Sequence, residues 1–184
     1  ARNYNNRNPE AWLYEISSEY LPREGEDLPE EKAVLMVGCY GGEADFFTLK
    51  GTVESLLSRL NLPRADYTAV STHPSYHPGR FAVLTVGDVE IGSVGEVHPT
   101  VLENFGIGCR AWVARLDIAR MFAARLPEAT YHALPRFPAS TRDLAVICDE
   151  SLPVAAIEKT ITGAVGNILE QIKLFDVYRG APVP

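Results

Sequence analysis

Residues 137–147 read FPASTRDLAVI and residues 174–180 read LFDVYRG, and a helical pattern separates the two stretches. Pro138 keeps the residue before it extended, and the apolar run at 144–147 predicts a short strand that ends at Asp149. Ser151 and Pro153 favour a helix start. The apolar residues that follow keep helical spacing: Val154, Ile157, Ile161, Val165 and Ile168.

A second strand is predicted to begin at Ile172 and to run through Leu174 and Phe175, and only four residues follow Gly180. A strand–helix–strand unit of this size leaves too much apolar surface uncovered to be stable alone. We therefore expect this βαβ to be the first half of a small domain that is cut short.

A second block, DFFTLKG at residues 45–51, opens an amphipathic helix that is predicted to reach about Leu60. Asp45 can cap its N-terminus, and Pro63 stops it. One face of this helix is apolar: Phe46, Leu49, Val53, Leu56, Leu57 and Leu60.

The remaining elements are mostly strands. Strands are predicted at 12–20, 33–40, 67–71, 81–86, 89–97 and 111–116, and short helices at 100–105 and 118–126. The run 33–40 is apolar enough to be buried on nearly both faces, residues 22–32 form an acidic loop, and Gly87-Asp88 signals a hairpin turn. Strands joined by hairpins, with few helices, predict an antiparallel sheet with flanking helices, hence an α+β fold.

Three prolines between Leu126 and Pro138 suggest a linker. We therefore predict a first module at 1–126, a linker at 127–138 and a partial second domain at 139–184.

Taken in order, five motifs carry a resemblance that covers the chain from about Leu13 onward: DFFTLKG at 45–51, HPGR at 77–80, GSVGEVHP at 92–99, RDLA at 142–145 and LFDVY at 174–178. Each motif is weak alone, but their order and spacing are specific. The chain resembles the C-terminal part of the β subunit of bacterial phenylalanyl-tRNA synthetase. In that family the HPGR motif forms a loop.

The resemblance implies a class II synthetase-like, non-catalytic module, followed by a truncated ferredoxin-like anticodon-binding domain. It also implies an α subunit partner that performs catalysis, an α2β2 tetramer, phenylalanine tRNA as a partner and a cytoplasmic location. ATP and magnesium would be used by the whole enzyme, with no cofactor in this chain.

The ferredoxin-like strand order places a third strand between the two strands predicted here. We therefore expect those two strands to pair with a neighbouring molecule or to pack in a rearranged way. The resemblance suggests Arg142 as a phosphate contact and Tyr178 as a base-stacking residue for tRNA. The simpler alternative is that Arg142 pairs with a carboxylate and that Tyr178 belongs to the core.

The composition is typical of a soluble globular protein and does not narrow the function further. The formal net charge of −7 argues against a free-standing nucleic-acid binder. The three cysteines, at 39, 109 and 148, show no paired ligand spacing and indicate free thiols in a reducing compartment. Neither a membrane-spanning run nor a signal peptide is evident.

Candidate chemistry is sparse, and we predict no catalytic residue and no metal site. His73 and His77 have the spacing of two zinc ligands on a helix, but the intervening Pro74 makes a helix improbable. Glu96 and His98 share a face of one strand, and a hydrogen-bonded structural pair is favoured over acid–base work. Trp12 and Trp112 are expected in the core. The glycines at 38, 41, 42, 92 and 95 favour tight packing or turns over a phosphate cradle.

Two alternatives stay open. The chain could be a stand-alone interaction or regulatory protein that reuses the fold, although such a protein should finish its last domain. An autonomous ATP-dependent ligase would need an arginine-rich ATP site, and the arginines at 59, 64, 80, 110, 115, 120 and 125 form no recognisable one. Phe81 stands where the family usually has a small residue, which predicts a filled rather than an open cleft.

Overall fold

The computed structural model describes residues 1–128, 130–131 and 136–180. The chain divides into two compact units, Ala1–Thr130 and Tyr131–Pro184, which we call unit 1 and unit 2. The predicted linker at 127–138 includes residues outside the described ones, so the domain boundaries at 126 and 139 stay predictions.

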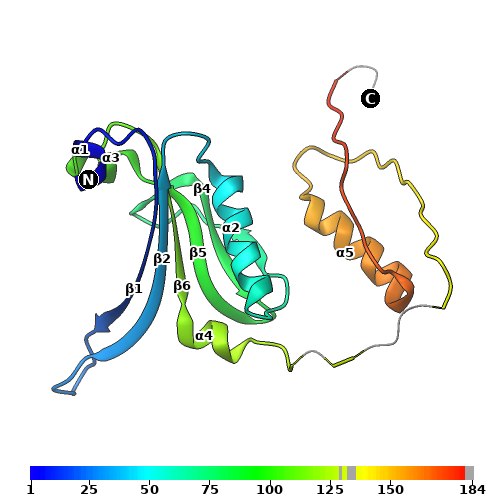
Figure 1. Ribbon diagram of the computed structural model, residues 1–184, viewed down its shortest axis with the longest axis horizontal. Coiled ribbons are helices and arrows are strands. Elements are labelled where there is room, and N and C mark those ends of the chain that lie inside the picture. The colour runs from blue at the N-terminus through cyan, green and yellow to red at the C-terminus, as the bar shows by residue number, and fades with distance from the viewer. Residues whose placement is uncertain (129, 132–135, 181–184) are drawn as a thin grey trace. The chain divides into compact units, whose positions relative to one another are not determined.

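Unit 1 is built on a six-stranded antiparallel sheet with the order β1-β2-β6-β5-β4-β3 (Figure 1). The strands are β1 (Ala11–Leu21), β2 (Glu30–Tyr40), β3 (Asp66–Ala69), β4 (Tyr76–Val86), β5 (Val89–Val97) and β6 (Ala111–Asp117). The hairpin predicted at Gly87-Asp88 joins β4 to β5, and Gly87 has the positive φ of 58° that such a turn needs. The predicted α+β class is confirmed.

Helix α2 (Phe46–Arg59) begins as the sequence predicts. Asp45 accepts a hydrogen bond from the Thr48 backbone at 2.7 Å, and the Thr48 hydroxyl accepts one from the Asp45 backbone at 2.8 Å, which forms a capping box. The bonds donated by Thr48 hold the pKa of Asp45 below its usual range. The helix ends at Arg59, before the predicted stop at Pro63, because Asn61 adopts a left-handed φ of 60°.

The core of unit 1 lies between α2 and one face of the sheet. Leu49, Val53 and Leu57 of α2 are fully or almost fully buried, and the helix packs on β5 and β6 (Figure 1). The sheet contributes Ala82, Leu84, Val94, Trp112, Ala114 and Leu116 to this layer. The apolar stripe predicted for the helix is therefore confirmed as a core face.

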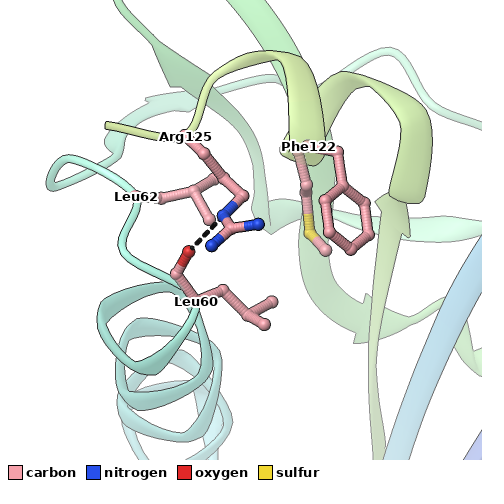
Figure 2. A pocket seen from close by; sticks show the side chains of 5 residues that line it. Leu60, Leu62, Phe122 and Arg125 are labelled. Carbon is pink, nitrogen blue, oxygen red and sulfur yellow. Dashed lines mark hydrogen bonds between the residues drawn. The ribbon is translucent and has the colours of Figure 1, made fainter. Parts of the chain in front are cut away.

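Three short helices complete unit 1: α1 (Arg2–Asn5), α3 (Pro99–Asn104) and α4 (Ile118–Ala123). Figure 2 shows how the segment after α4 contacts the end of α2: Arg125 Nε donates to the Leu60 carbonyl at 2.9 Å. The Arg125 guanidinium also lies 5.6 Å from the centre of the Phe122 ring. The depression at this junction has no room for a water molecule, so it is a packing contact rather than a ligand site.

Two glycines of β5 allow neighbouring strands to approach closely. A Cβ atom added to Gly92 would lie 2.2 Å from the Arg115 carbonyl oxygen of β6. One added to Gly95 would lie 2.7 Å from the Arg80 carbonyl oxygen of β4. Tight packing, which the sequence favours over a phosphate cradle for these two glycines, is confirmed.

Three expectations for the strands of unit 1 were wrong or only partly met. The HPGR motif at 77–80 does not form a separate loop but belongs to β4, where the pairing with β5 is irregular between Tyr76 and Phe81. Trp12 is 48% exposed because β1 is an edge strand and α2 packs on β5 and β6. Strand β2 is mostly half-buried rather than buried on both faces.

Unit 2 contains α5 (Val154–Val165), as predicted, and a 3-10 turn at Gly166–Ile168. The strands predicted at 144–147 and from Ile172 to Tyr178 are not present as strands, since those residues have no regular secondary structure. A strand needs a partner for its backbone groups, and the described residues of unit 2 form no sheet. An apolar hollow of about 380 Å³ lies between α5 and residues 144–146.

Within the described residues, no helix has the length and apolar character needed to cross a membrane.

Candidate functional site

The face of the sheet opposite α2, which we call the open face, carries an ion pair between β1 and β6, the two strands on either side of β2. Arg115 lies between Ala114 and Leu116, which both point into the core, so its own side chain points to the open face. Its Nε donates to Glu19 Oε1 at 2.7 Å, and its Nη2 contacts Glu19 Oε2. This two-point contact lowers the pKa of Glu19 and raises that of Arg115, since each charge favours the other.

Aromatic rings fill the neighbouring part of the open face. The rings of Tyr76 and Phe81 stack with centroids 4.3 Å apart, and His73 lies 5.1 Å from Phe81. Phe81 is only 6% exposed. Burial raises the pKa of Tyr76, and a hydrogen bond with Ser93 opposes this shift. The filled cleft predicted from Phe81 agrees with this packing.

A second charged cluster surrounds Glu96, which is 3% exposed near the end of β5. Arg80 Nη1 donates to Glu96 Oε2 at 2.6 Å, and Arg110 Nε lies 3.2 Å from Glu96 Oε1. A buried carboxylate is costly unless it is paired and hydrogen-bonded, and here two guanidinium groups pair it.

The predicted pair of Glu96 and His98 is wrong, because the two residues have separate partners. His98 is the N-cap of α3, where its Nδ1 accepts a hydrogen bond from the Thr100 backbone at 3.2 Å. His73 and His77 play similar local roles, since their Nδ1 atoms accept from the backbones of Ser75 and Gly79. No group of three or more metal-ligating side chains occurs among the residues that the structure describes.

The two residues suggested for tRNA contact lie in unit 2. Arg142 Nη1 donates to the Ser140 hydroxyl at 2.9 Å and to the Thr141 carbonyl at 2.7 Å. Tyr178 is 65% exposed in this chain, but the alternative that places it in the core concerns the complete domain and stays open. Neither observation tests contact with RNA, and both roles stay predictions.

The sequence did not predict the partners of Arg115, Arg80 and Arg110. Glu19 and Arg115 are 96 residues apart in the sequence, and their contact depends on the strand order, which places only β2 between β1 and β6. The available signal was a single charge inside an otherwise apolar strand, AWVARL at 111–116. Because a charged side chain is rarely buried without a partner, Arg115 is expected to pair with an opposite charge on the face of the sheet away from the core. Arg80 and Arg110 gave no comparable signal, because neither lies within an apolar run.

Comparisons with known proteins match both units. The family model described as "Phenylalanyl tRNA synthetase beta chain CLM domain" matches residues 1–118. The model described as "Ferredoxin-fold anticodon binding domain" matches residues 135–184.

Curated relatives agree with the family models. The phenylalanine–tRNA ligase β subunits of Clostridium tetani and Clostridium acetobutylicum are each 42% identical to this chain over its whole length. That of Symbiobacterium thermophilum is 44% identical over 93% of the chain. The chain spans 23%, 23% and 20% of the length of these three relatives.

Among solved structures, pyrrolysyl-tRNA synthetase from Desulfitobacterium hafniense overlaps 60% of this chain and 40% of its own, at 18% identity and a TM-score of 0.48. That likeness is too weak to establish a class II fold. The family models and the relatives are decisive by themselves: the chain belongs to the phenylalanyl-tRNA synthetase β chain family.

Proposed function

We propose that this chain is part of the β subunit of a phenylalanine–tRNA ligase, which attaches phenylalanine to its tRNA with ATP. The observation that carries the proposal is that two family models match one chain in succession, at 1–118 and at 135–184. Relatives about four times as long carry the same segment at 42% identity.

Within the whole enzyme, unit 1 would be a non-catalytic, class II synthetase-like scaffold for the α subunit in an α2β2 tetramer. The packing on the open face supports this role. Glu19 engages Arg115 at two points, and stacked rings occupy the adjacent surface. Catalysis, with its ATP and magnesium, would belong to the α subunit, and the assembly would work in the cytoplasm.

Unit 2 would supply part of the anticodon-binding domain. We propose a catalytic-like module at 1–126, a linker at 127–138 and a partial ferredoxin-like domain at 139–184. The family matches, which end at 118 and begin at 135, support this division. Arg142 and Tyr178, both exposed, would contact a phosphate and a base of the tRNA.

The alternative of a stand-alone interaction protein has weaker support. It would require both units to work apart from the longer chain in which their relatives occur. Four relatives with 40–44% identity are named as phenylalanine–tRNA ligase β subunits. This favours the ligase subunit.

The proposed interface with the α subunit lies on an edge strand. The apolar face of α2 is not available for it, because that face is buried in the core. Strand β1 is the exposed element instead: Trp12, Tyr14 and Ile16 are 48%, 79% and 64% exposed on the same side of the sheet. Exposed apolar side chains in a row are typical of a protein–protein contact.

Replacement of Tyr14 and Ile16 by Glu in the complete β subunit is expected to weaken assembly with the α subunit by at least tenfold. Burying each of these side chains contributes roughly 1.5–3 kcal/mol, and a buried unpaired carboxylate opposes association. Sedimentation velocity over a range of subunit concentrations measures the effect.

Two controls accompany this pair of substitutions. Tyr14→Phe keeps the apolar surface and should assemble normally, and Phe105→Glu changes an exposed ring outside β1. Unchanged assembly of the double variant would remove β1 from the interface. The same experiment tests the proposed function, because wild-type subunits should co-purify and phenylalanylate tRNA.

A second expected result concerns RNA. The 184-residue chain should not bind tRNA measurably, whereas a version extended through a complete ferredoxin-like domain should bind weakly. The reason is that residues 144–147 and 172–178 do not form strands in the described structure, so alternate side chains are not held on one surface. Fluorescence anisotropy with labelled tRNA compares the two proteins. Equal, tight binding by both would contradict the expectation.

A further inference from the structure

The cluster around Glu96 holds two arginines in place from opposite sides of β5. Arg80 comes from β4 and Arg110 from the segment just before β6, and the two contact different oxygens of one carboxylate. The irregular pairing of β4 beside Gly95 contributes to this arrangement, since only a residue without Cβ lets the Arg80 backbone come so close. The arginine pair is therefore preorganised by the fold.

This arginine pair carries more charge than Glu96 neutralises. One carboxylate faces two guanidinium groups, which leaves a net charge of +1 at this point. Each guanidinium contacts Glu96 through a single nitrogen, Nη1 of Arg80 and Nε of Arg110, so this carboxylate leaves most of the roughly ten N–H donors unused. The side chains are 39% and 62% exposed, so solvent reaches both.

The local positive charge is unusual for this chain. The chain as a whole has a formal net charge of −7, so two solvent-accessible arginines held by one buried carboxylate are not part of a generally basic surface. Guanidinium groups fixed in a plane recognise carboxylates and phosphates at two points. A phosphodiester presents one negative charge on two unesterified oxygens, which matches the charge of the pair and its two donor groups.

We propose that Arg80 and Arg110, oriented by Glu96, bind a backbone phosphate of tRNA. This rests on the proposed function, which makes tRNA the polyanion that the assembled enzyme handles. The contact would position the RNA on unit 1 and would carry no sequence information, as is usual for phosphate contacts. It would act in addition to the anticodon contacts of unit 2.

The test uses Arg110→Gln in the complete synthetase assembled from both subunits. This variant leaves Glu96 paired with Arg80, so the fold is retained. The tRNA dissociation constant is measured by fluorescence anisotropy between about 50 and 200 mM salt. We expect roughly fivefold weaker binding and a plot of log K against log salt whose slope is shallower by about 0.7–0.9, the range for one lost phosphate contact.

Two further variants serve as controls: one tests whether charge alone at residue 110 is sufficient, and the other tests whether the effect is specific to that position. Arg110→Lys keeps the charge but not the planar fork, so the salt slope should stay near that of the wild type while affinity falls slightly. Arg59→Gln removes one exposed arginine from the end of α2 and should change neither quantity.

The proposal is overturned if Arg110→Gln binds tRNA with the wild-type affinity and salt slope. It is also overturned if that variant binds tRNA normally but assembles poorly with the α subunit, because the anion would then be a carboxylate of the partner. Failure of the wild-type assembly to phenylalanylate tRNA would refute the proposed function itself, and absence of any tRNA binding would refute both.

Discussion

Gly92→Ala is expected to lower the free energy of unfolding of unit 1 by about 3 kcal/mol. The new Cβ would lie 2.2 Å from the Arg115 carbonyl oxygen, 2.9 Å from Leu116 Cδ2 and 3.0 Å from the Leu116 Cα. Leu116 is completely buried, so neither its side chain nor the β6 backbone can move aside without disturbing the core. Overpacking of this kind typically costs 1–3 kcal/mol, and a clash with backbone belongs at the upper end.

Urea unfolding of the wild type and the variant measures this loss. Gly51→Ala is the matched control, because the same substitution inside α2 meets nothing within 4 Å. It should stabilise the protein by about 0.5–1 kcal/mol through higher helix propensity. A Gly92→Ala curve that coincides with the wild type would show that β5 and β6 are not packed as described.

The 184-residue chain alone should show no phenylalanine-dependent exchange of pyrophosphate into ATP, whereas the complete synthetase should show ready exchange. Arg115, the arginine of β6 on the open face, is held by Glu19 at two points, and the stack of Tyr76 and Phe81 fills the adjacent surface. Binding ATP there would require breaking the ion pair and displacing buried rings.

The Glu19→Ala variant gives a stricter test of this prediction. It removes the partner of Arg115 and leaves the aromatic stack intact. Pyrophosphate exchange by this variant should still stay at background. The control is the same purification from cells without the expression plasmid, since a trace of host synthetase would give a false signal. Exchange that rises with the amount of purified chain, above that control, would refute a non-catalytic role.

Local periodicity was enough to predict most of unit 1. The 3.6-residue spacing of Leu49, Val53 and Leu57 predicts α2 and its buried face, and the Gly87-Asp88 turn predicts the hairpin of β4 and β5. Both features are encoded within a few residues. Trp12 shows the limit, because its burial depends on how far α2 extends across the sheet.

Long-range features could not be predicted in the same way. The pairing of Glu19 with Arg115 requires the order of the strands, and the arginines around Glu96 meet through an irregular β4–β5 register. Residues 144–147 have the composition of a strand, yet a strand exists only when a neighbour satisfies its backbone groups. For these residues the strand prediction was wrong, because composition alone does not supply a neighbouring strand.

The placement of the tryptophans determines what spectroscopy can detect. Both tryptophans of the chain, Trp12 and Trp112, lie in unit 1, so indole emission reports the unfolding of unit 1 alone. Helix α5 belongs to unit 2 and contributes to far-ultraviolet circular dichroism without an indole nearby in its own unit. If the melting curves from tryptophan fluorescence and from circular dichroism do not coincide, their separation measures how independently the two units unfold.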